Sequence, residues 1–139
     1  MRANELLRAL TEANIPGDTP IASRRGLSTA PIGHLATSTI ALMEGGSPCV
    51  IASEDDLMHA VPASTLIGTL EAMPDAAPVL LGYDSGSGDY GQLCCDIAGA
   101  LLNGRQEVIL VGVSESEGSD LGRALPLEGA GCRILLSAE

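Results

Sequence analysis

The residues best suited to chemistry lie in the glycine- and serine-rich segment Tyr83–Gly91, which follows an apolar run and precedes a helical pattern. A strand that turns directly into a helix presents several backbone N–H groups at one point, where the helix dipole also favours an anion. The same turn can present a nucleophile, and Ser85 and Ser87 are the candidates for that role. This turn therefore has two candidate chemistries, anion binding and nucleophilic catalysis.

The sequence lacks a residue that each chemistry needs: anion binding lacks a phosphate-binding motif, and nucleophilic catalysis lacks an evident base. The turn has neither P-loop nor dinucleotide-binding spacing, and Asp84 and Asp89 would repel a phosphate. A serine nucleophile needs a base, and the only histidines, His34 and His59, fall in helical patterns with apolar neighbours, where we expect half-buried structural side chains. The structural alternative is that a side chain of the turn caps the next helix. The candidate ligand-binding residues are Asp84, Ser85, Ser87 and His59.

Composition excludes some classes of partner. The net charge is −11, with seven Lys and Arg among 139 residues, and nucleic-acid binding needs clustered basic side chains. The adjacent Arg24 and Arg25 could bind a carboxylate or a phosphopantetheine phosphate, but we expect them to be surface side chains that are solvated or salt-bridged. No apolar run reaches the roughly 20 residues that cross a bilayer.

The cysteines point to a reducing compartment. They show no CxxC spacing and no nearby histidine ladder, so we expect no zinc site and no other cofactor. Scattered thiols in a chain without a signal peptide suggest a cytoplasmic protein. The four are Cys49, Cys94, Cys95 and Cys132.

The elements around the turn follow from apolar spacing and from helix breakers. We expect helices over residues 2–15, 24–46, 56–73 and 88–104, the third broken at Pro62. We expect strands over residues 49–53, 77–85, 107–114 and 131–139, and a βαβ unit from 77 to 114. No internal repeat is evident, so residues 1–139 are interpreted as a single α/β domain, a mixed, mostly parallel sheet with helices packed on it.

Several segments run in the order of a known family. They are "RRGLSTAPIGHLATSTIALMEGG", "CVIASEDDL", "HAVPASTLIGTLEAM", "APVLLGYDSGSGDYGQLCCDIAGALLNGRQEVILVGVSE" and "LEGAGCRILLSAE". Together they resemble the N-terminal half of thiolase-fold condensing enzymes, especially the β-ketoacyl-synthase-like proteins of aryl-polyene and related polyketide pathways. A second register would place "EDDLMHA" at the nucleophile turn and "VLLGYDS" after the central helix.

The resemblance implies a non-catalytic relative with a thiolase-like fold. The family's cysteine nucleophile is replaced at the turn by Ser85, Gly86 and Ser87, while Cys94 and Cys95 lie well inside the expected helix. The family's catalytic histidines belong to a C-terminal half that this chain does not contain. The implied function is a ketosynthase-like subunit of fatty-acid or polyketide biosynthesis that scaffolds a ketosynthase, an acyl carrier protein or a second copy of itself.

Two other functions remain open. One is a small serine-dependent acyl transferase or hydrolase, and the other is a module that binds phosphate or a small ligand at Tyr83–Gly91.

Overall fold

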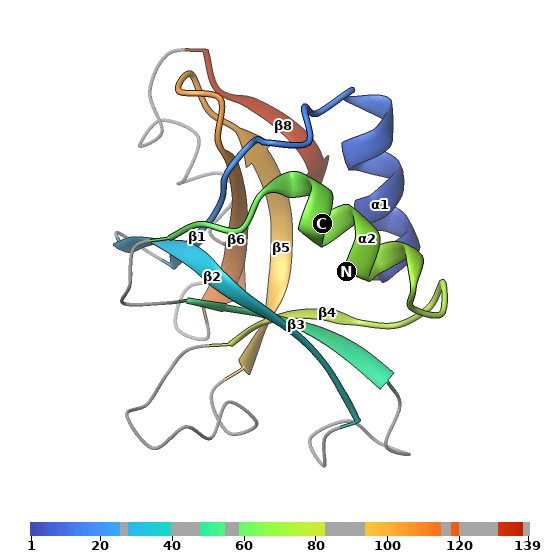
Figure 1. Ribbon diagram of the computed structural model, residues 1–139. Coiled ribbons are helices and arrows are strands. Elements are labelled where there is room, and N and C mark those ends of the chain that lie inside the picture. Colours follow the sequence, from blue (N-terminus) through green and yellow to red (C-terminus); the bar gives the residue numbers. More distant parts are fainter. Residues whose placement is uncertain are drawn as a thin grey trace.

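Six strands of the protein close into a small β-barrel, and two short helices lie on one side of it (Figure 1). The computed structural model describes residues 1–25, 28–39, 48–54, 59–82, 94–114, 118–119 and 131–137. In chain order the elements are α1 (Ala3–Glu12), β1 (Ile21–Arg25), β2 (Ser28–Thr39), β3 (Pro48–Glu54), α2 (Ala63–Glu71), β4 (Val79–Gly82), β5 (Cys94–Leu102), β6 (Val108–Ser114), β7 (Gly118–Ser119) and β8 (Arg133–Ser137).

The barrel closes because β1 pairs with β6 as well as with β2. Neighbouring strands run antiparallel except at two joints, β3–β4 and β6–β1, where they run parallel. Helix α2 connects the parallel strands β3 and β4, so a parallel crossover exists at this joint. The short strands β7 and β8 extend the sheet from β6 and β5.

This architecture corrects the predicted fold class. The expected α/β sheet with helices packed on it, half of a thiolase-like fold, is wrong, because the chain forms a mostly β barrel with only two short helices among the described residues. The predicted βαβ unit over residues 77–114 is also wrong, since β4, β5 and β6 are antiparallel neighbours.

Two predicted helices are strands. Residues 28–39 of the expected helix 24–46 form β2, and residues 94–102 of the expected helix 88–104 form β5. In each strand a β-bulge shifts the register, between Ile32 and His34 in β2 and between Ile97 and Gly99 in β5. An extra residue in a strand lets side chains three positions apart face the same side, which imitates helical spacing.

Other elements agree with their predictions. The first helix is present as α1, and the strands predicted over 49–53, 77–85, 107–114 and 131–139 appear as β3, β4, β6 and β8. The break at Pro62 is confirmed, because α2 begins at the next residue.

The main core fills the barrel and joins it to the helices. All six barrel strands contribute buried apolar side chains to it, and Leu6 and Leu10 of α1 and Leu66 and Leu70 of α2 complete it. In β6 the four residues from Val108 to Val111 are fully buried, so this strand is covered on both faces.

The barrel consists of two similar halves, which we call the first half (α1, β1, β2, β3) and the second half (α2, β4, β5, β6). Each half is one helix followed by a three-stranded antiparallel meander, and the two parallel joints connect the halves. The expectation of no internal repeat is therefore wrong at the level of structure.

Backbone contacts repeat this symmetry in detail. The residue before α1, Arg2, bridges to Pro78 before β4, and the residue before α2, Pro62, bridges to Pro20 before β1. The matching hydrogen bonds, both 2.7 Å long, run from the Ala3 N–H to the Ala77 carbonyl and from the Ala63 N–H to the Thr19 carbonyl.

Candidate functional site

The structure describes the strand from which the predicted turn departs, but not the turn itself. Asp84, Ser85, Gly86 and Ser87 lie outside the described residues, so their roles stay predictions. Strand β4 ends at Gly82, immediately before the predicted turn. Any site that the predicted turn completes would therefore include described residues next to Gly82.

Gly82 belongs to a row of residues that crosses four strands. It pairs with Ser53 of β3 and with Cys94 of β5, and Ser53 pairs with His34 of β2. Side chains alternate between the faces of a strand. Because Ala52 belongs to the main core, Ser53 lies on the outer face of the barrel.

The Ser53 side chain is fully buried, and its hydroxyl makes no hydrogen bond. Buried polar groups almost always have partners, and leaving one unpaired costs about 1–3 kcal/mol. One explanation for such a group is a ligand that supplies the missing hydrogen bond.

His34 is the direct antiparallel partner of Ser53, and its side chain is exposed. Side chains of directly opposed residues lie on the same face, with their Cβ atoms about 4.5–5.5 Å apart. The row therefore places an imidazole beside the unpaired hydroxyl.

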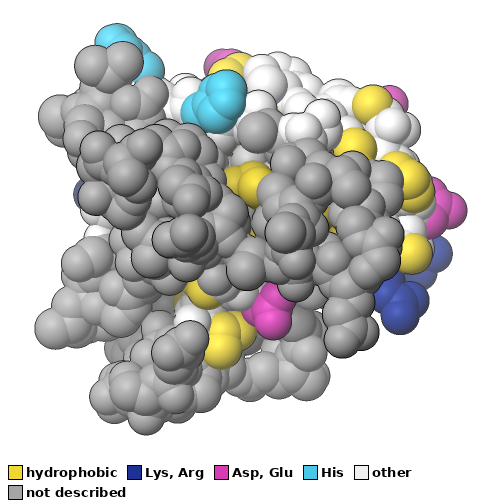
Figure 2. Space-filling model, turned by 90° about the horizontal axis from the view of Figure 1, so that it is seen from below, with side chains coloured by type: hydrophobic (Ala, Val, Ile, Leu, Met, Phe, Trp, Pro, Cys, Tyr) yellow, Lys and Arg dark blue, Asp and Glu magenta, His cyan; other side chains and the backbone are white. Residues whose placement is uncertain are grey.

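Neither histidine matches its sequence-based prediction of a half-buried side chain in a helix. His34 lies on β2, His59 precedes α2, and both are exposed. Figure 2 shows histidine side chains near one edge of the face seen from below. The chain also approaches β2 after His59, because the Val61 N–H donates to the Ile32 carbonyl at 2.7 Å.

The equivalent row in the second half has a different chemistry. There Val111 takes the place of Ser53, Gly99 that of His34 and Arg24 that of Gly82. The second half thus has no hydroxyl and no imidazole at these three positions, and the fourth residue of its row, the equivalent of Cys94, is Thr29. Arg24 is buried rather than solvated, so its prediction as a surface side chain is wrong.

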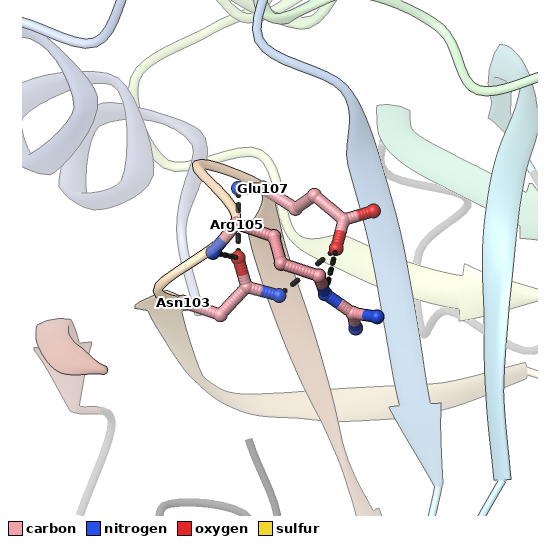
Figure 3. Close-up of polar contacts among 3 residues, drawn as sticks. All are labelled: Asn103, Arg105 and Glu107. Carbon is pink, nitrogen blue, oxygen red and sulfur yellow. Dashed lines mark hydrogen bonds and ion pairs between the residues drawn. The ribbon is translucent and has the colours of Figure 1, made fainter. Parts of the chain in front are cut away.

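A second polar cluster holds the turn between β5 and β6 (Figure 3). The Asn103 Oδ1 accepts hydrogen bonds from the backbone N–H groups of Arg105 at 3.0 Å and Glu107 at 2.9 Å, and its Nδ2 donates to Glu107 Oε1 at 3.0 Å. The Arg105 Nε lies 3.2 Å from the same oxygen. Because Asn103 is buried and its amide serves this turn, we interpret the cluster as structural.

Among the described residues, no group of three or more His, Cys, Asp and Glu side chains could hold a metal ion. No helix in the described part of the chain is long and apolar enough to span a bilayer.

Comparison with known proteins found no matching family model, no matching curated protein and no matching solved structure. The resemblance to ketosynthase-like proteins, and the subunit function that it implies, therefore stay predictions. They no longer have the support of a thiolase-like fold.

Sequence reasoning missed Ser53, which was only included in the strand predicted over residues 49–53. A usable signal exists in the segments "ANELLRAL" and "ASTLIGTL", which share their first Ala and their two later Leu positions. When the halves are aligned from these helices and from the strand pairings, Ser53 and Val111 occupy equivalent positions. The alignment therefore shows that the first half has a polar residue where the second has an apolar one.

Proposed function

We propose that this protein is a non-catalytic module that binds a small polar ligand. The ligand would bind on the outer face of the barrel, near the carboxyl ends of the parallel strands β3 and β4. The observation that carries the proposal is the buried Ser53 hydroxyl without a hydrogen-bond partner. It stands beside Gly82, which has no side chain, and opposite His34. The ligand would supply the missing hydrogen bond and so recover its cost.

The surrounding charge favours a neutral or cationic ligand. The chain carries a net charge of −11, and Asp96 is exposed on β5, where it pairs with Leu80 two residues before Gly82. A hydroxyl oxygen and an imidazole can both accept a hydrogen bond. A small amino alcohol matches these groups better than a phosphate does.

A serine hydrolase or acyl transferase is less well supported at this row. Such an enzyme needs the serine hydroxyl to donate to a histidine that acts as its base. Ser53 makes no such bond to His34, because its hydroxyl has no hydrogen-bond partner. We therefore expect no covalent labelling of Ser53 by a fluorophosphonate probe.

Thermal unfolding with added ethanolamine tests the proposal, with inorganic phosphate as the contrasting probe. We expect ethanolamine to raise the melting temperature of the wild type and to have no effect on Ser53→Ala, because binding to the native state stabilises it. Ser23→Ala is the matched control, since Ser23 is also buried on a strand and donates to the Ala30 carbonyl.

The Ser23→Ala variant should keep the response to ethanolamine. The proposal is wrong if the wild type does not respond, or if Ser53→Ala responds equally. A response to phosphate alone would contradict the expectation of a neutral or cationic ligand and would indicate that the site binds an anion.

A further inference from the structure

The two halves differ in how many strands lie beside their middle strand. In the second half, β8 pairs antiparallel with β5 along Gly99–Leu102, on the edge opposite to β6. Because β5 and β2 hold equivalent places, the matching edge on β2 begins at His34. A position built like the one that β8 fills therefore exists in the first half.

That position has no occupant among the residues that the structure describes. Between His34 and Thr39, β2 pairs with β3 on one side, and no described residue pairs with it on the other. The last backbone contact before this stretch is the bond from the Val61 N–H to the Ile32 carbonyl.

The helices flank the two positions alike. Helix α1 contacts β8, and helix α2 contacts β2. Leu7 of α1 and Ile67 of α2 hold equivalent places, and both are half-buried against the main core. A strand added to β2 would thus lie beside α2 as β8 lies beside α1.

The edge of β2 also lacks the usual protection against strand pairing. Exposed edges are commonly guarded by charged side chains, prolines or bulges. Strand β2 contains no Asp, Glu, Lys or Arg over Ser28–Thr39, although the chain as a whole is strongly acidic. Its Pro31 and its bulge come before the open stretch.

We propose that the edge of β2 from His34 to Thr39 pairs antiparallel with the same edge of a second copy. A two-fold axis brings identical edges together, and an uncharged strand meets its own copy without like-charge repulsion. The resulting dimer joins two barrels through a continuous sheet.

Light scattering coupled to size-exclusion chromatography tests this dimer at micromolar concentration. We expect a dimer for the wild type and, for Thr37→Lys, a dissociation constant raised at least about tenfold, because two like charges meet at the axis. Thr29→Lys is the matched control, since Thr29 is also exposed on β2 but lies where the strand is paired with β1. The control should remain dimeric.

A monomeric wild type overturns the proposal, as does equal behaviour of the two lysine variants. Hydrogen exchange on the wild type gives a test that needs no variant. The proposal requires that amide protection within residues 34–39 rises with protein concentration, while protection in β6 does not change. Concentration-independent exchange in β2 would refute the pairing.

Discussion

The first and second halves of the barrel share a backbone plan but differ in the polarity of one row. Their helices, strand pairings and bulges correspond. At the carboxyl ends of the parallel joints, however, the first half has Ser53, His34 and Gly82, where the second has other residues. Packing constrains both halves alike. A polar group that packing does not require, such as the Ser53 hydroxyl, is therefore a better indicator of function than the residues that the halves share.

The ends of the two helices also differ. After the C-cap of α1, Asn14 has the left-handed conformation (φ 54°), and the Ile15 N–H donates to the Leu10 carbonyl at 3.3 Å. This is a Schellman motif. Helix α2 is one residue shorter, and the second residue after its C-cap Ala72 is Pro74, which has no N–H to donate. The symmetry therefore holds for the packing and not for every cap.

The largest expected effect tests the similarity of the halves. Leu6 and Leu66 are fully buried at equivalent positions of α1 and α2. We expect Leu6→Ala and Leu66→Ala each to lower the free energy of unfolding by about 2–5 kcal/mol, measured by urea denaturation. A small effect in one helix beside a large effect in the other would show that the halves do not share one core.

A smaller effect is expected at the turn between β5 and β6. Asn103→Ala removes three hydrogen bonds within the β5–β6 turn, so we expect a loss of about 1–3 kcal/mol in the free energy of unfolding. Arg105→Ala, which removes an exposed side chain of the same cluster, should cost at most about 1 kcal/mol. Equal losses would contradict the larger contribution that we expect from the Asn103 amide.

Sequence reasoning identified the elements whose apolar spacing has one meaning. The amphipathic helix α1, the break at Pro62 and the short apolar strands β3, β4 and β6 were predicted. The two failed helices, at β2 and β5, are equivalent in the halves and failed for the same physical reason. The bulges put Ile32 and Leu35, and likewise Ile97 and Ala100, three apart and against the same core.

The candidate site could not be found from local patterns. The Ser53 hydroxyl is notable because it is buried without a partner, and the Ser53–His34 neighbourhood depends on the register between β2 and β3. Both are products of tertiary structure. The similarity between the two helix segments was present in the sequence to suggest the duplication, as were the prolines that precede β1 and β4.

The first half has a buried hydroxyl, that of Ser53, to which its own fold gives no hydrogen-bond partner. Urea denaturation of Ser53→Ala, compared with Ser23→Ala, measures this directly. We expect Ser53→Ala to be as stable as the wild type or more stable by about 1 kcal/mol, and Ser23→Ala to be less stable by about 1 kcal/mol, because only Ser23 loses a hydrogen bond. A loss of stability in Ser53→Ala as large as that in Ser23→Ala would contradict the account.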